Sequence, residues 1–279
     1  MDLGTKDSAH MSAGNDVDDL LSLAERRRPY LSLLSAGPEH KRDVIDELGD
    51  SRSTVDRAIE RLADRGLVDR TDDGAWTATT KGELLLETVE ETRACVESIA
   101  AGADLLAHLP CDEPVPPALF RDAAVDIADG PTPLAIAERV RDTVATATGI
   151  RGFAVADHGA GVNEDILAST FGDDGFEFDY VFDRSLVEGM QPAEDVSWAE
   201  LTDPPNAHAT VASDLPFGLM LTEHDDGPRL TIVVYDDRNV VQGQVQTDNP
   251  EAVAWGSDVF ERYRERGTPL TTWLESNGR

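Results

Sequence analysis

The stretch from Val44 to Arg70 constrains the fold more than any other, because start and stop signals mark the ends of two short helices. The second of these helices carries an apolar stripe at helical spacing, formed by Val55, Ala58, Ile59 and Leu62. Ser51 or Ser53 can cap its N-terminus, and Gly66 can end it. The stretch therefore predicts helix, tight turn, helix and the start of a strand, with a helical hairpin inside another fold as the alternative.

The exposed side of the second helix is polar and rich in arginine. The run Ser-Arg-Ser-Thr-Val from Ser51, followed by Arg-Gly-Leu-Val from Arg65, resembles the recognition half of a winged helix-turn-helix domain. Such domains lay this helix in the DNA major groove, while the wing touches the backbone. The resemblance implies DNA contacts by Arg42, Ser51, Arg52, Ser53, Thr54, Arg57, Arg61 and, on the wing, Arg70.

The segments around this motif complete the predicted domain. Residues 17–35 predict a first helix, and residues 41–48 a short second one. Residues 67–70 and 75–79 flank an Asp-Gly turn, which predicts the hairpin of the wing. We expect Trp76 to fill the core beneath the wing, because it alternates with another apolar residue on one face of its strand.

Two further expectations concern the N-terminal end of the chain. Residues 1–15 are small, polar and glycine-containing, and we expect them to be disordered. The basic run of residues 26–28 fits phosphate contact and a solvated helix face equally well.

Residues 83–110 predict a long connecting helix, started by a capping sequence at residues 80–83. Its apolar residues recur at heptad spacing, which is typical of a seam between two helices. We expect this seam to join two copies of the chain, with packing inside one chain as the alternative. Its residues are Leu85, Val89, Val96, Ile99 and Leu106.

Residues 111–279 predict one mixed α/β domain after a proline-rich linker. The expected strands are residues 153–156, 177–183, 217–222, 230–235 and 240–246, the last three forming a meander. The expected helices are residues 132–148, residues 163–171 and a final helix opened by Asn249-Pro250. The fold class is therefore α+β, with domains at 1–15, 16–82, 83–110 and 111–279.

Three runs carry a second resemblance, namely residues 178–183, 233–237 and 254–263. Together with the winged helix, they resemble haloarchaeal and methanogen regulators that have a middle domain of the methanogenesis/filamentation-regulator type. The resemblance covers residues 16–270 and implies a dimeric transcription factor on double-stranded DNA, whose C-terminal domain senses or relays an unidentified small-molecule or protein effector. An adaptor that uses its winged helix to bind a protein is the alternative. It is less favoured, because an adaptor does not need arginines on the face that would enter the groove.

The charge of the chain is strongly negative, at −31, and it is unevenly spread. Residues 16–82 carry 11 Lys and Arg against 15 Asp and Glu, whereas residues 83–279 carry 12 against 38. This acid surplus, with only 3 lysines, resembles proteins of salt-accumulating halophilic archaea. At molar salt the Debye length is about 3 Å, so an acidic surface does not destabilise the compact state there.

The chain lacks the usual marks of an enzyme or a metal protein. No phosphate-binding, zinc-protease or serine-hydrolase motif occurs, and residues 82–279 contain no lysine. His158 could face a cleft but fits a loop better, and the pairs at 225–226 and 236–237 fit solvated turns better than cation sites. Cys95 and Cys111 have no disulfide or metal spacing. We therefore expect no catalysis, cofactor, metal or membrane span, and a cytoplasmic protein.

Overall fold

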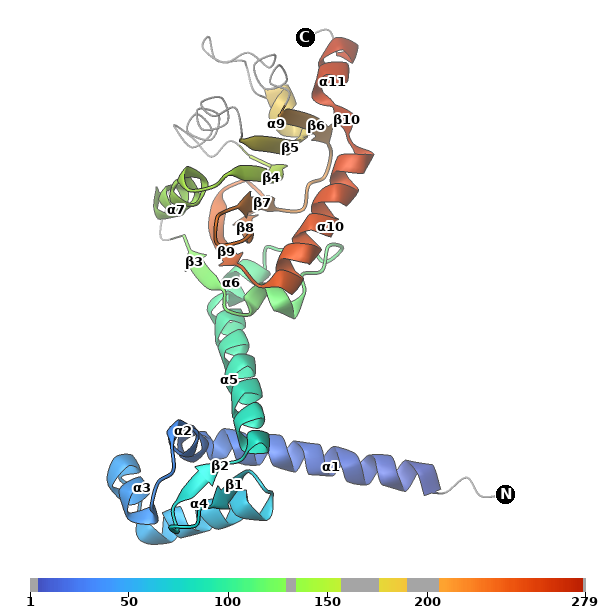
Figure 1. The fold of residues 1–279 in the computed structure, drawn as a ribbon. Coiled ribbons are helices and arrows are strands. Elements are labelled where there is room, and N and C mark those ends of the chain that lie inside the picture. Colours follow the sequence, from blue (N-terminus) through green and yellow to red (C-terminus); the bar gives the residue numbers. More distant parts are fainter. Residues whose placement is uncertain (1–4, 129–133, 157–175, 190–205, 278–279) are drawn as a thin grey trace. The chain divides into compact units, whose positions relative to one another are not determined.

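The computed structural model describes residues 5–128, 134–156, 176–189 and 206–277 (Figure 1). The chain divides into two compact units, Met1–Arg93 and Ala94–Arg279, and the long helix α5 contributes to both. The fold is α+β, as predicted, with a mainly helical first unit and a second unit built on a mixed sheet.

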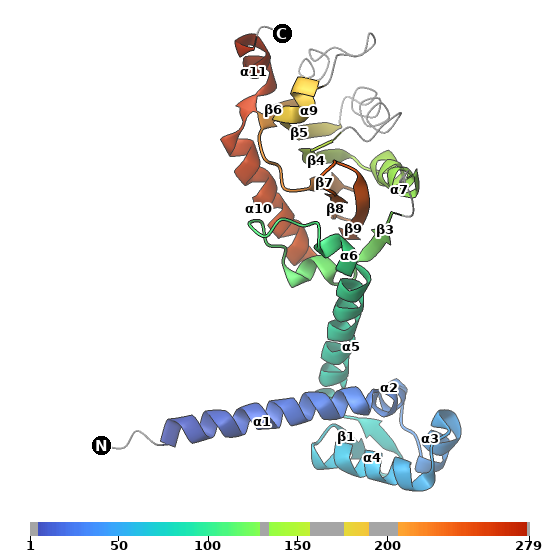
Figure 2. The ribbon, with the colours of Figure 1, turned by 180° about the vertical axis from the view of Figure 1, so that it is seen from behind.

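The first unit is four helices, a two-stranded hairpin and the start of α5 (Figure 2). Its elements are α1 (Thr5–Arg26), α2 (Arg28–Ala36), α3 (Lys41–Leu48), α4 (Arg52–Asp64), β1 (Val68–Arg70), β2 (Trp76–Ala78) and α5 (Thr80–Ala101). Three of these elements lie where the sequence predicts them, namely the helix at 41–48, the helix after Ser51 and the hairpin of the wing.

The first helix differs from the prediction in two ways. It is broken at Arg27, because Pro29 has no N–H to continue the helical ladder of α1, whereas it fits the first turn of α2. At its other end α1 begins at Thr5, so it includes most of the segment expected to be disordered. Once residues 17–26 are helical, each further residue adds one hydrogen bond without a new nucleation step.

The core of the first unit is formed by one apolar side of each helix. Its fully buried residues include Leu31, Leu34, Val44, Val55, Ile59, Leu62 and Leu67. Trp76 packs against this cluster, as expected, and its strand β2 also forms a bridge to Glu39.

Helix α5 begins beside Leu67, the residue that precedes β1. The hydroxyl of Thr79, not Thr80, caps it by accepting from the N–H of Gly82 at 3.1 Å. A side chain at Gly82 would place its Cβ 2.0 Å from the carbonyl oxygen of Leu67. Glycine is therefore required there, because only hydrogen fits beside that backbone.

The second unit surrounds an eight-stranded sheet. After α5 its elements are α6 (Ala103–Leu106), η1 (Pro117–Phe120), β3 (Ala124–Ile127), α7 (Leu134–Ala145), β4 (Gly149–Ala154), β5 (Glu177–Asp183), α9 (Arg184–Gly189), β6 (Ala207–Ala212), β7 (Gly218–Glu223), β8 (Arg229–Tyr235), β9 (Val241–Thr247), α10 (Pro250–Arg266), β10 (Thr268–Pro269) and α11 (Leu270–Ser276).

The strand order is β10-β6-β5-β4-β7-β8-β9-β3. Strands β4, β5 and β6 are parallel, and all other pairs are antiparallel. The predicted meander is present as β7, β8 and β9.

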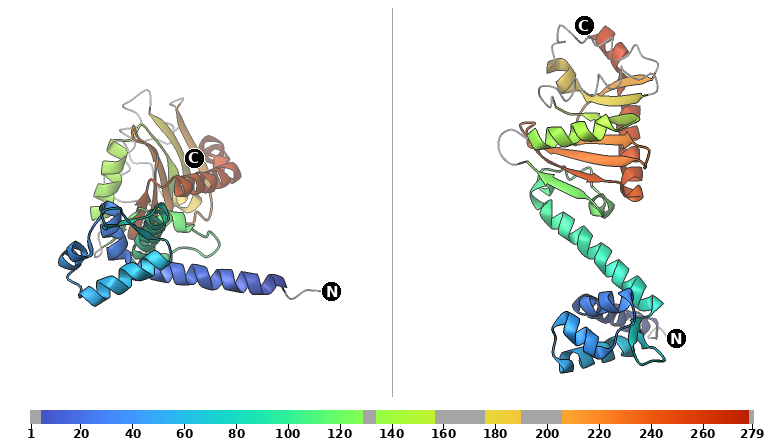
Figure 3. Two further views of the ribbon diagram at one scale, coloured as in Figure 1. Left: turned by 60° about the horizontal axis from the view of Figure 1, so that its bottom comes forward. Right: turned by 60° about the vertical axis from the view of Figure 1, so that its left-hand side comes forward.

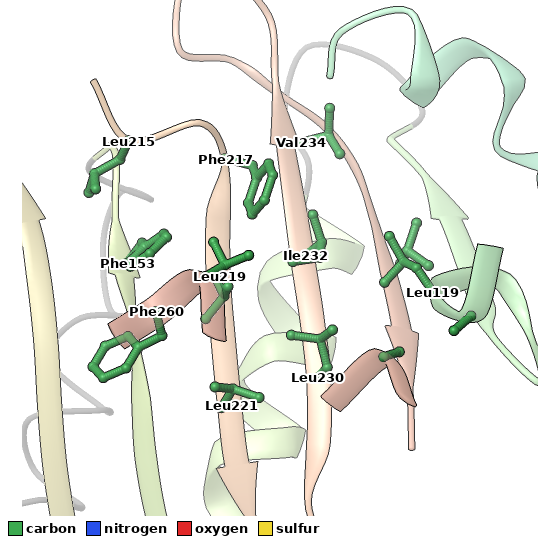
Figure 4. Close-up of a cluster of buried hydrophobic side chains, with 14 of the residues drawn as sticks. Leu119, Phe153, Leu215, Phe217, Leu219, Leu221, Leu230, Ile232, Val234 and Phe260 are labelled. Atoms are coloured by element: carbon green, nitrogen blue, oxygen red, sulfur yellow. The ribbon is translucent and has the colours of Figure 1, made fainter. Parts of the chain in front are cut away.

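The two faces of the sheet are covered by different helices (Figure 3). Helix α10 lies on one face, where Phe153 stacks with Phe260 over a cluster shared by β7 and β8 (Figure 4). Helix α7 packs on the other face through Val140 and Val144. The aromatic residues at 176, 178 and 180 are buried there, so they belong to the core.

Several elements were not predicted, namely η1, β3, β6, α9, β10 and α11. The helix opened by Asn249-Pro250 is α10, and Asn249 caps it through the N–H groups of Glu251 and Ala252. The predicted strand at 153–156 is β4, displaced toward its N-terminal side. The predicted helix at 163–171 and the start of the one at 132–148 lie outside the described residues.

Candidate nucleic-acid interface

The turn between α3 and α4 is fixed from both sides. Gly49 ends α3 in the left-handed conformation at φ 68°, and its N–H donates to the carbonyl oxygen of Ile45. The hydroxyl of Tyr30, on α2, donates to the carboxylate of Asp50. Burial, together with this hydrogen bond, raises the pKa of Tyr30 to about 12. The turn is thereby attached to the core of the unit.

Ser51 is the residue that caps α4. Its Oγ accepts from the backbone N–H of Thr54 at 3.3 Å and lies 2.8 Å from the Thr54 hydroxyl. The hydroxyl of Ser53 is 3.1 Å from the same Oγ. The three hydroxyls therefore form one cluster at the start of α4, where free backbone N–H groups favour an anionic partner.

The arginines of α4 lie opposite its apolar stripe. Arg52, Arg57 and Arg61 are exposed, as is Ser53, whereas Thr54 is half-buried. The four stripe residues are fully buried, at positions 55, 58, 59 and 62. The predicted groove-facing side of α4 is thus accessible along its length.

The other two predicted arginines are exposed but partly engaged. The Nε of Arg42 lies 3.1 Å from a carboxylate oxygen of the adjacent Asp43. The Nε of Arg70 donates to the carbonyl oxygen of Gly74 at 3.4 Å, so this side chain folds along the turn of the wing.

Lys41 is a further cation at this surface, and the sequence did not single it out. Its Nζ lies 2.7 Å from Oδ1 of Asp56 on α4 and 5.8 Å from the ring centroid of Trp76 on β2. It therefore connects α3, α4 and the wing. The available signal was its position beside Arg42 at the start of a helix that precedes the predicted recognition helix.

The surface is not uniformly basic. Asp56 and Glu60 lie on the exposed side of α4, strand β1 carries the exposed Asp69, and the turn of the wing contains Asp72 and Asp73. The pKa of Asp73 is lowered, first by a hydrogen bond from the hydroxyl of Thr71, so its carboxylate is charged at neutral pH. Phosphate contact is thus favoured along α4 and at the start of α3 and disfavoured at the tip of the wing.

The basic run at 26–28 has contacts within its own unit. Arg26 donates to the carbonyl oxygen of Ser22, Arg27 lies over the ring of Tyr30, and Arg28 pairs with Glu90 at 3.9 Å. A groove of about 500 Å³ beside α5 has glutamates as half of its lining residues, and these do not suit a phosphate.

The predicted seam residues of α5 are divided between the two cores. Leu85 and Val89 pack in the first unit, and Ile99 and Leu106 pack in the second. Val96 lies between them and is 57% exposed. Of the five residues, Val96 is therefore the one whose side chain is mainly free for a contact with another chain.

Features that would indicate chemistry are scarce in the described residues. There, no group of three or more His, Cys, Asp or Glu is placed to hold a metal ion. Asp236 accepts from the N–H groups of Val240 and Arg238, which lowers its pKa, so it stabilises a turn as expected. His158 lies outside the described residues. No helix of the described chain is both long and apolar enough to cross a membrane.

Two family descriptions match the sequence. Residues 133–266 match the middle domain of the methanogenesis regulatory protein FilR1. Residues 15–101 match a family described as the HVO_A0261 N-terminal domain. No curated protein matches the chain.

Three solved structures show low sequence identity to this chain. TrmBL2, described as an archaeal chromatin protein with a novel mode of DNA binding, is 11% identical, with a TM-score of 0.42 over 91% of this chain and 99% of that one. NucT from Helicobacter pylori is 9% identical, with a TM-score of 0.40 over 53% and 98%. IclR from Thermotoga maritima is 10% identical, with a TM-score of 0.21 over 90% and 96%. Likeness at this level does not indicate what the chain binds.

Proposed function

We propose that the chain is a transcriptional regulator similar to FilR1, and that it acts as a homodimer that binds double-stranded DNA sequence-specifically through α4. The observation that carries this proposal is the separation of the two sides of α4. Four apolar residues anchor the helix in the core, while Arg52, Arg57 and Arg61 stand exposed on the other side. An exposed arginine row beside a serine-capped N-terminus suits a helix that enters the major groove.

Individual roles follow from position along α4. Arg52 and Arg57 lie in the N-terminal half of the helix and are the candidates for bidentate contacts with guanine. Arg61 lies a turn further on, and with Arg42 on α3 we assign it to phosphate. Arg70 is assigned to phosphate at the side of the wing, because its side chain runs along the turn. Phosphate contacts position the protein without reading sequence.

Dimerisation and effector sensing complete the proposal. We propose that the exposed part of α5 around Val96 contacts a second copy, which would place two recognition helices about 34 Å apart or a multiple of that distance. The second unit would bind a small molecule or a protein and shift the dimer between two states by its different affinity for them. We also propose that the protein works at molar salt, as its charge of −31 suggests.

The test is binding of the full-length chain to duplex DNA from upstream of its own gene, followed by fluorescence anisotropy. Losing a bidentate base contact costs about 1–3 kcal/mol at one base pair. We therefore expect Arg52→Ala and Arg57→Ala each to weaken this binding and to relax specificity at one position. Arg184→Ala, on α9 of the second unit, is the control and should leave affinity unchanged.

A different result would point to the adaptor. If neither variant of α4 changes the affinity for DNA, the exposed arginines serve another partner. Acidic residues at the tip of the wing would suit a protein surface better than DNA, so capture of a transcription protein that depends on Asp72 and Asp73 would replace the present proposal.

A further inference from the structure

One carboxylate stands among the cations of the α4 surface. Oδ1 of Asp56 lies 2.7 Å from Nζ of Lys41, and Oδ2 lies 3.9 Å from Nε of Arg52. The hydrogen bond from Lys41 is the main cause that lowers the pKa of Asp56. The two cations come from different helices, so Asp56 is their common partner.

The exposure of the three side chains indicates which cation can leave Asp56 for another partner. The Arg52 side chain is 88% exposed, whereas those of Lys41 and Asp56 are 34% and 37% exposed. Arg52 can leave its long contact freely. Lys41 is held more firmly, because its Nζ is hydrogen-bonded to Asp56 and also lies over the ring of Trp76.

These contacts set up a competition between Asp56 and DNA. A phosphate that approaches the start of α3 and α4 meets two positive charges that are already paired with one negative charge. To bind both cations fully, the DNA must displace a carboxylate that stays on the same surface. That carboxylate repels phosphate and loses water and hydrogen bonds, unless the DNA offers it a donor.

Only one base presents a donor without an adjacent acceptor to a carboxylate in the major groove. Cytosine carries its N4 amino group there, and Asp or Glu accepts from it. Asp56 lies one helical turn after Arg52, near the end of α4 that points toward base edges in this kind of docking.

We propose that Asp56 is a specificity-determining residue. It keeps Lys41 and Arg52 in ion pairs on unrelated DNA and releases them, Lys41 to phosphate and Arg52 to guanine, where a cytosine amino group satisfies its carboxylate. The inference rests on the proposed DNA-binding function. It assigns to Asp56 and Lys41 a role in discrimination between operator and other DNA, in addition to the arginine contacts. The pairing with Asp56 would also limit the affinity of these cations for DNA of unrelated sequence.

The experiment compares Asp56→Asn with Glu60→Gln in the full-length chain. Glu60 lies on the same exposed side of α4, and within the described residues no ion pair holds it. Both variants remove one negative charge, but Asp56→Asn alone frees Lys41 and Arg52. Binding to an unrelated duplex and to the upstream DNA is measured at several KCl concentrations at which circular dichroism shows a folded chain.

We expect Asp56→Asn to bind the unrelated duplex more tightly than Glu60→Gln does. Its plot of log affinity against log salt should steepen by about 1.8, because two more phosphate contacts each add about 0.9. The ratio of specific to non-specific affinity should fall. Equal affinities and equal salt dependence in the two variants would overturn the inference, because Asp56 would then act only through its contribution to the net charge.

Two further measurements test the coupling between Asp56 and Lys41 and the base that Asp56 contacts. Lys41→Met should change non-specific affinity little in the wild-type chain and clearly in the Asp56→Asn chain, which a double-mutant cycle detects as coupling. Selection from a random duplex library should show cytosine at one position for the wild type and adenine there for Asp56→Asn, since Asn pairs with adenine. Absence of coupling, or an unchanged selected sequence, would contradict the proposal.

Failure of the proposed function would look different. A wild-type chain that binds no duplex at any salt would remove both proposals together. A wild-type chain that binds its upstream DNA through Arg52 and Arg57, while the variants at Asp56 and Glu60 behave alike, would leave the regulator standing and reject only the role of Asp56.

Discussion

Tyr30 is a single residue that ties the turn before α4 to the core of the first unit. Its hydroxyl donates to Asp50 from within the core of the first unit. A hydrogen bond to a charged partner contributes about 1.5–3 kcal/mol. We expect Tyr30→Phe and Asp50→Asn each to lower the free energy of unfolding by about this much, without adding in the double variant. Denaturant unfolding measures it, and Asp46→Asn on the exposed side of α3 is the control.

The same hydroxyl predicts a response to alkaline pH. The pKa of Tyr30 rises from 10.0 to about 12 on folding, so the folded state favours the neutral hydroxyl. This stabilisation is fully present below pH 10 and is lost as the pH rises through 12. The difference in stability between the wild type and Tyr30→Phe should therefore shrink over that range, in unfolding curves recorded at each pH. A difference that is constant with pH would mean that Tyr30 does not titrate as the structure implies.

The sequence predicts which residues form the surface of α4, but not how they pair. Its apolar stripe, the arginines opposite it and the left-handed Gly66 follow from spacing and propensity alone. The pair between Lys41 and Asp56 does not, because its partners are 15 residues apart and meet only when the turn is folded. The choice of Ser51 over Ser53 as the cap likewise depends on where the turn ends.

At the scale of elements, α5 shows that a heptad pattern does not reveal whether its apolar residues pack within one chain or against a second chain. The heptad pattern of apolar residues is present on α5. Its first residues pack in the core of the first unit and its last residues in the core of the second, while Val96 between them is exposed. We expect Val96→Asp to weaken the proposed dimer, as measured by the mass from light scattering. Leu84→Asp is the matched control, because Leu84 is equally exposed at 59% and lies about 120° around the helix from Val96. A dimeric mass in both variants would place the contact elsewhere.

Prediction of the other elements succeeded where local signals are strong. Strand β5 and the meander β7-β8-β9 show alternation and Asp/Gly-rich turns, and the prediction of these strands is confirmed. Strand β6 was missed because its run Ala-His-Ala-Thr-Val-Ala is composed mostly of small residues that alternate weakly. It becomes a strand by pairing in parallel with β5, and such a contact leaves no local trace in the sequence.

For the molecule as a whole, the net charge of −31 opposes binding to a polyanion. The Debye length is about 30 Å at 0.01 M salt and about 3 Å at 1 M. Repulsion should therefore dominate at low salt, while at molar salt the contacts of α4 survive. We expect folding and specific DNA binding to persist in molar KCl and to fail, or become non-specific, near 0.1 M, roughly where the Debye length reaches 10 Å. Circular dichroism and operator binding, followed together, test this. Binding that tightens steadily toward low salt in a folded chain would refute it.

The position of β10 has a consequence for aggregation. This strand is only Thr268–Pro269, yet it occupies the outer side of β6 and so ends the sheet. Proline offers no N–H to a further strand, which makes it a suitable residue at a sheet edge. Removing residues 268–279 would uncover the backbone of β6, a flat edge that can recruit strands from other molecules. We expect the shortened chain to form intermolecular β-structure on mild heating while the intact chain stays dispersed, as infrared spectra and turbidity would report.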